Sequence, residues 1–210
     1  MVSVLMLAIA AVQLACVAAL PIALREPRVW LLRLVGVGVA YDSAIIGLGA
    51  LIGAGDLLHD LSMGRFLGHA ILTPLLVVWA ADRVRTRWFP VWAAWLVTLA
   101  LVAWALLSEV AGLELETRDY ADTLRYTARD PAGPPYPTLV VIALLFVACV
   151  VLWRREGLYW PLLGVIGVTV ASGAAFAVPP LGNAGEALLL AGLVTAERSR
   201  PERLDADLPN

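Results

Sequence analysis

Residues 137–155 read PTLVVIALLFVACVVLWRR, and this stretch decides the fold class. From Leu139 to Trp153 it contains no charged side chain, and the pair Arg154-Arg155 follows at once. A helix needs roughly 20 mostly apolar residues to cross the hydrocarbon core of a bilayer. The stretch therefore predicts a membrane-spanning helix over 136–153, with two arginines at one membrane surface.

Six further apolar runs flank this helix along the chain. They cover 2–24, 29–54, 64–81, 89–112, 159–178 and 182–196. Hydrophobic residues make up 61% of the 210 residues and charged residues 15%, whereas a soluble domain carries about 25% charged residues. The sequence thus predicts an all-α integral membrane protein with about seven transmembrane helices in one domain, 1–197, and a tail at 198–210. The run 2–24 lacks a basic start, so it is interpreted as a retained helix and not as a signal peptide.

All fifteen cations are arginines, and their distribution predicts the orientation. Eleven lie on one side of the predicted bundle: Arg25, Arg28, Arg33, Arg83, Arg85, Arg87, Arg154, Arg155, Arg198, Arg200 and Arg203. Four lie on the other side: Arg65, Arg118, Arg125 and Arg129. Because arginine is enriched in cytoplasmic loops, we expect a multi-pass protein of the cell membrane with its N-terminus outside and its C-terminus in the cytoplasm. The absence of lysine excludes a retinal Schiff base and a P-loop. The composition is typical of GC-rich bacterial genomes.

The longest connection, 113–135, lies on the predicted outer side. It is acidic, contains Tyr120 and Tyr126, and ends in the sequence PAGPP. A long connection in a compact protein is commonly a lid or a binding element, and a solvated linker is the alternative.

Three ionisable residues and one amide stand out within the apolar runs: Asp42, His69, Glu186 and Gln13. An ionisable group at bilayer depth is costly and marks a functional site by default. With a rise of 1.5 Å per residue, Asp42 lies about 20 Å above the inner end of its helix. His69 and Glu186 lie within the first turns of helices that run inward. The three ionisable groups are therefore expected in one layer, the outer half of the membrane.

Other polar residues lie on the same helix faces as these ionisable groups. Arg65, His69 and Thr73 follow an i, i+4, i+8 spacing on one helix face, and Asn183 lies three residues before Glu186. Structural explanations remain open for each: Asp42 paired with His69 or Arg65 to fix helix register, Glu186 as a helix cap, and Gln13 as an interhelical hydrogen-bond donor.

Burial disfavours an ionised carboxylate, and a protonated carboxyl is a general acid that a nearby histidine can supply with protons. The hypothesis is a membrane-embedded enzyme that acts on a lipid or isoprenoid, for example by protonation-driven cyclisation. Asp42, Glu186 and His69 are the candidate catalytic residues. The candidate substrate-binding residues are Tyr41, Arg65, Thr73, Asn183, Tyr120, Tyr126 and Gln13.

In architecture alone this arrangement resembles seven-helix membrane-embedded terpene cyclases, which use two intramembrane acidic residues. With only two histidines in the chain, we expect no metal or cofactor; the expected partner is a membrane lipid or an apolar small molecule, and no nucleic acid. An accessory or binding subunit and a proton-coupled transporter of small solutes are the alternatives.

Overall fold

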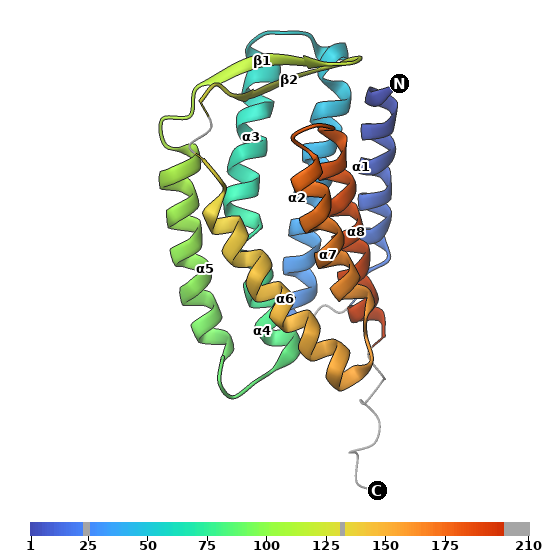
Figure 1. The fold of residues 1–210 in the computed structure, drawn as a ribbon, viewed down its shortest axis with the longest axis vertical. Coiled ribbons are helices and arrows are strands. Elements are labelled where there is room, and N and C mark those ends of the chain that lie inside the picture. Colours follow the sequence, from blue (N-terminus) through green and yellow to red (C-terminus); the bar gives the residue numbers. More distant parts are fainter. Residues whose placement is uncertain (23–25, 131–132, 200–210) are drawn as a thin grey trace, which may run out of the picture.

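The computed structural model describes residues 1–22, 26–130 and 133–199. Its helices are α1 (Val2–Ala18), α2 (Pro27–Ile52), α3 (Asp56–Leu72), α4 (Leu75–Val84), α5 (Val91–Ala105) with the π-helical turn η1 (Leu106–Val110), α6 (Tyr136–Glu156), α7 (Trp160–Ala174) and α8 (Pro180–Arg198). Strands β1 (Leu115–Tyr120) and β2 (Thr123–Ala128) form an antiparallel hairpin. Successive helices run up and down the long axis, with the hairpin across one end (Figure 1). We call this the hairpin end, and the opposite end the arginine end.

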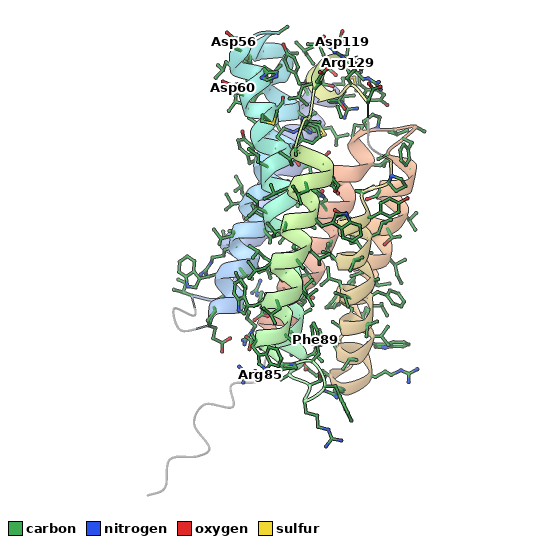
Figure 2. All side chains as sticks on the ribbon, turned by 90° about the vertical axis from the view of Figure 1, so that its left-hand side faces the viewer. Asp56, Asp60, Arg85, Phe89, Asp119 and Arg129 are labelled. Atoms are coloured by element: carbon green, nitrogen blue, oxygen red, sulfur yellow. The ribbon has the colours of Figure 1, made fainter. Side chains whose placement is uncertain are left out.

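Four helical segments are long and apolar enough to cross a membrane: Pro27–Ile52, Asp56–Val84, Val91–Val110 and Tyr136–Glu156. Helices α1 and α7 are apolar but shorter. Figure 2 shows labelled charged side chains at both extremes of the bundle, with Asp56, Asp60, Asp119 and Arg129 at the hairpin end and Arg85 at the other. The prediction of a helical membrane protein is confirmed at this level. The expected tail at 198–210 lies outside the described residues from position 200 onward.

The third predicted span, 64–81, has different bounds in the structure, where α3 and α4 together form it; we call this pair of helices the third rod. It begins at Asp56 and not at 64, because its first two turns are polar and extend the helix beyond the apolar run. It is also divided into α3 and α4 at Thr73-Pro74, where proline supplies no amide hydrogen to the helical ladder. The carbonyl of Pro74 accepts a hydrogen bond of 3.1 Å from Thr98 Oγ1 on α5. The Pro74 carbonyl also accepts a hydrogen bond of 3.0 Å from the Val77 amide, so it links the start of α4 to α5.

Most of the connection 113–135 forms a β-hairpin, which the sequence analysis did not anticipate. The strands pair from Leu115 with Ala128 to Tyr120 with Thr123, so the turn consists of Ala121 and Asp122. Ala121 has a φ of +53°, the left-handed conformation that a two-residue hairpin turn requires. Residues 115–128 thus form a cover over the hairpin end.

The hairpin lies directly on α2 at Gly49. A Cβ atom at this position would be 1.8 Å from the backbone oxygen of Leu124 in β2. We therefore expect Gly49→Ala to displace the hairpin, at the cost of about 1–3 kcal/mol that overpacking usually carries. The population of undocked hairpin then rises about 5- to 150-fold, and tryptic cleavage after Arg118 and Arg125 accelerates accordingly.

Gly182→Ala is the matched control for this substitution. Its new Cβ would meet Ala175 Cβ at 3.5 Å, which is ordinary van der Waals contact. Equal cleavage rates for the two variants would contradict the docking of the hairpin on α2.

The hairpin turn also holds the start of α1. Asp122 Oδ1 accepts a hydrogen bond of 2.6 Å from the amide of Val2, and the Asp122 carbonyl accepts one of 2.6 Å from Ser3 Oγ. The amino group of Met1 pairs with Asp122 Oδ2. One carboxylate thus neutralises and caps the first turn of the helix, where the helix dipole favours negative charge.

This contact predicts a pH dependence. The Met1 ammonium, together with the Val2 and Ser3 amides, lowers the pKa of Asp122 from 3.8 to about 2. Because the folded-state pKa is depressed, the stabilising contact is fully present above pH 3.8 and is lost as the pH falls through about 2. We expect the Asp122 carboxyl resonance to titrate near pH 2 in micelles. A midpoint near 3.8 would show that the turn does not hold α1.

The arginine end encloses a cluster of charges. Arg28 and Arg83 are 2% and 5% exposed, and Glu197 is 4% exposed. Arg28 Nε donates to both carboxylate oxygens of Glu197, at 3.2 and 3.0 Å. Trp79 Nε1 also donates to Glu197, at 3.0 Å, and Arg83 Nη2 donates to Glu156 at 2.6 Å. The distribution of arginines predicts both Arg28 and Arg83 at the membrane surface, but both are buried.

Candidate functional site

Asp42 on α2 has partners for both of its carboxylate oxygens. Arg65 Nε, from α3, donates to Oδ1 at 2.8 Å, and Asn183 Nδ2, from α8, donates to Oδ2 at 2.6 Å. Of the two pairings left open by the sequence, the hydrogen-bonded one is therefore Asp42 with Arg65. A guanidinium and an amide donor both stabilise the ionised carboxylate. Asp42 is thus held as a fixed negative charge between three helices.

Asn183 extends this network toward α1. Its Nδ2 also lies 3.1 Å from Ser43 Oγ, and its backbone oxygen accepts a hydrogen bond of 3.3 Å from Gln13 Nε2. Gln13 is fully buried, in agreement with its interpretation as an interhelical donor. The polar network therefore joins α1, α2, α3 and α8.

A small cavity lies beside this network. Its polar lining consists of Asp42, Arg65, His69, Thr73 and Glu186. The helix face that carries Arg65, His69 and Thr73 therefore meets α2 and α8 at this cavity. Its volume is about 20 Å³, which is enough for one water molecule. The three ionisable residues expected in one layer thus surround a single small space.

Glu186 differs from Asp42 in that it forms no salt bridge with any described residue. Its Oε2 is shielded from solvent and lacks a hydrogen-bond partner within the described part of the chain. No side chain caps the start of α8, so Glu186 does not serve as the cap considered above. A desolvated carboxyl without a donor is most stable in its protonated form. The site therefore contains one stabilised carboxylate and one carboxyl suited to carry a proton.

A second, much larger cavity adjoins the small one. Its volume is about 800 Å³, within the range of about 300–1,000 Å³ usual for ligand sites. His69, Thr73 and Glu186 line both cavities. Nearly half of the lining residues are leucine, isoleucine or valine, contributed by α2, α4, α6, α7 and α8: Leu32, Val35, Val39, Leu76, Leu139, Ile142, Val168, Leu189, Leu190 and Leu193.

The arrangement of α6 and α7 gives this cavity its place in the bundle. The two helices meet at the arginine end and diverge toward the hairpin end (Figure 1). Lining residues in this region include Phe176, 95% exposed, and Leu139, 51% exposed. The cavity therefore reaches the lateral surface of the bundle between α6 and α7.

Hydroxyl groups that the sequence analysis did not single out also line the large cavity. Thr138 Oγ1, near the start of α6, lies 3.4 Å from His69 Nε2. Thr169 and Ser172 contribute from α7. Single hydroxyl residues are common in membrane helices, so only their position beside His69 distinguishes them. No pattern in the sequence indicates this proximity, which depends on how α6 crosses α3.

The candidate tyrosines lie away from the large cavity. Tyr41 donates from its hydroxyl to the Leu61 carbonyl at 2.8 Å. The ring of Tyr126 stands edge-on against His59, with centroids 5.3 Å apart, and its carbonyl lies 3.5 Å from Arg65 Nη1. Tyr120 lines a small space near the start of α1 together with Asn183. These three residues connect the hairpin and helices around the site.

Comparison of the chain with models of protein families, with curated proteins and with solved structures gives no match.

Proposed function

We propose that the protein is a membrane-embedded enzyme that acts on a lipid or isoprenoid by general acid–base chemistry. The proposal places seven spans across the membrane, the hairpin and N-terminus outside, and the C-terminus in the cytoplasm. The eleven-to-four distribution of arginines supports this orientation. The N-terminus and the last residue of α8 lie at opposite ends of the described bundle, which supports it as well (Figure 1).

The observation that carries the proposal is an unpartnered carboxyl in the wall of a large apolar cavity. Glu186 Oε2 has no hydrogen-bond partner in the described structure, and the residue lines the cavity of about 800 Å³. We assign Glu186 as the general acid, because its protonated form is favoured there and an apolar ligand would lie within its reach.

Asp42 and His69 have different roles in this proposal. Asp42 remains ionised through Arg65 and Asn183, so it stabilises positive charge that develops on the substrate after protonation. His69 lines both cavities and is the group that accepts the proton when the product loses one. In a cyclisation, the Glu186 proton adds to a C=C bond of the substrate, and the π electrons of a second C=C bond capture the resulting cation and close the ring. Loss of a proton to His69 forms a new C=C bond, and transfer of that proton from His69 to Glu186 restores the site.

The test compares lipid extracts by mass spectrometry. A strain of the source organism that lacks the gene is complemented with wild type or with Glu186→Gln, which keeps the shape of the side chain but supplies no acidic proton. We expect the product lipid of the wild type to fall by about 10²- to 10⁴-fold in the variant, the usual contribution of a general acid.

Glu109→Gln is the matched control for this experiment. Glu109 lies in η1, also has a shielded carboxylate oxygen without a partner, and lines neither cavity. Its substitution should leave the lipid profile unchanged. An unchanged profile for Glu186→Gln at equal protein levels contradicts the enzymatic proposal.

One observation favours a second candidate, a binding or accessory subunit. The network of Asp42, Arg65 and Asn183 would also hold helices together without any chemistry. This alternative predicts that Glu186→Gln changes no lipid, whereas loss of Asp42 reduces the amount of folded protein.

A further inference from the structure

The large cavity has very few charged groups in its wall. Among its described lining residues, the ionisable ones are His69 and Glu186, and none is an arginine. Arg65 lines only the small cavity, where its Nε is bound to Asp42 at 2.8 Å and its Nη1 lies 3.5 Å from the Tyr126 carbonyl. No guanidinium is therefore directed into the large cavity by the described residues.

This charge distribution disfavours a phosphate-bearing ligand. A buried phosphate requires arginine, lysine or a metal ion, because an anion that loses its water without such partners is strongly destabilised. The polar group of the ligand should therefore be uncharged.

The polar side chains also gather in one part of the cavity. Thr138 and Ser172 lie near the hairpin-side ends of α6 and α7, and Thr138 lies beside His69. Toward the arginine end the lining is formed by Leu32, Leu76 and Leu193. A ligand with one small polar group and a long apolar body matches this division.

We infer that the cavity binds a neutral lipid with a single hydroxyl- or carbonyl-sized polar group, which enters from the bilayer between α6 and α7. The polar group lies beside His69, Thr138 and Glu186, and the hydrocarbon body extends toward Leu32 and Leu193. The claim that this lipid is the substrate rests on the proposed function. The claim that the cavity binds such a lipid does not depend on whether the lipid is converted.

The test measures equilibrium binding to the purified protein in lipid nanodiscs by native mass spectrometry. Geranylgeraniol and geranylgeranyl diphosphate serve as probes, because they share a hydrocarbon chain and differ in the charge of the polar group. We expect the alcohol to bind at least about tenfold more tightly than the diphosphate, a difference of about 1.4 kcal/mol.

Two substitutions to tryptophan locate the binding. Gly173 lines the cavity and an added Cβ meets no atom within 4 Å, so Gly173→Trp fills the space without a clash at the backbone. Val147 on α6 is 62% exposed and does not line the cavity, so Val147→Trp is the control. Alcohol binding should fall at least about tenfold in the first variant and stay unchanged in the second.

The outcomes separate this inference from the proposed function. Equal or tighter binding of the diphosphate, or full alcohol binding by Gly173→Trp, overturns the inference even where Glu186→Gln abolishes lipid turnover. Alcohol binding that is retained by Glu186→Gln and lost in Gly173→Trp supports the inference. This binding result supports the inference even if the lipid extracts contain no enzymatic product. Absence of a product overturns only the proposed function.

Discussion

Glu197→Gln is expected to lower the free energy of unfolding by about 1–3 kcal/mol, the usual cost of leaving buried hydrogen-bonding groups without their partner. Arg28 is 2% exposed and directs its Nε at both oxygens of Glu197, while Arg83 Nε lies 4.0 Å from the same carboxylate. The neutral amide keeps the volume but removes one carboxylate, and leaves Arg28 with Glu26 and Asp82 and Arg83 with Glu156. Unfolding in detergent micelles, followed by circular dichroism, measures the change.

Glu114→Gln provides the comparison for this measurement. Glu114 pairs with Arg129 at 2.6 Å, but its side chain is 71% exposed. Exposed pairs contribute about 0–1 kcal/mol, because water solvates each partner when the other is removed. A loss for Glu197→Gln no larger than that for Glu114→Gln would show that the charges at the arginine end are hydrated in the folded protein.

The pair Asp42–Arg65 should give an even clearer signature in a double-mutant cycle. Asp42→Leu leaves the guanidinium of Arg65, 11% exposed, without its carboxylate, and Arg65→Leu leaves Asp42 with Asn183 alone. Each single substitution is expected to cost about 3–5 kcal/mol. The double variant removes both charges and should cost clearly less than the sum, with a coupling of about 0.5–3 kcal/mol.

The same variants separate stability from chemistry. A folded double variant that still lacks the product lipid supports the electrostatic role proposed for Asp42. Additive losses, with no coupling beyond about 0.5 kcal/mol, would contradict the direct contact between the two side chains.

The sequence allowed the helical membrane class to be predicted because span length and hydropathy follow directly from bilayer thickness. Helix α6, predicted over 136–153, occupies Tyr136–Glu156. The predicted start of the third span, residue 64, was wrong because hydropathy detects only the apolar part of a helix. The first turns of α3 contain Asp56, His59 and Asp60 and are polar. The hairpin was missed because its pairing depends on cross-strand contacts within a short polar stretch.

The sequence predicts the depth of the candidate site residues in the membrane but not their hydrogen-bond partners. Helix direction placed Asp42, His69 and Glu186 in one layer, and the structure gives them a shared small cavity. The choice of Arg65 over His69 as the partner of Asp42 depends on side-chain conformations that spacing does not determine. Arg28 and Arg83 were misplaced because the rule for loop arginines takes no account of acidic partners, and Glu197 is 169 residues from Arg28 in the chain.

The burial of Arg28 beside Glu197 also has a consequence for biogenesis. Synthesis proceeds from the N-terminus, so Arg28 and Arg83 leave the ribosome long before the helix that carries Glu197. Glu26 and Asp82 pair with Arg28, Glu156 on α6 pairs with Arg83, and all three carboxylates are synthesised before α8. Insertion of α8 then adds Glu197 to these pairs. The carboxylate that completes this charge cluster thus arrives only after the arginines and their other acidic partners.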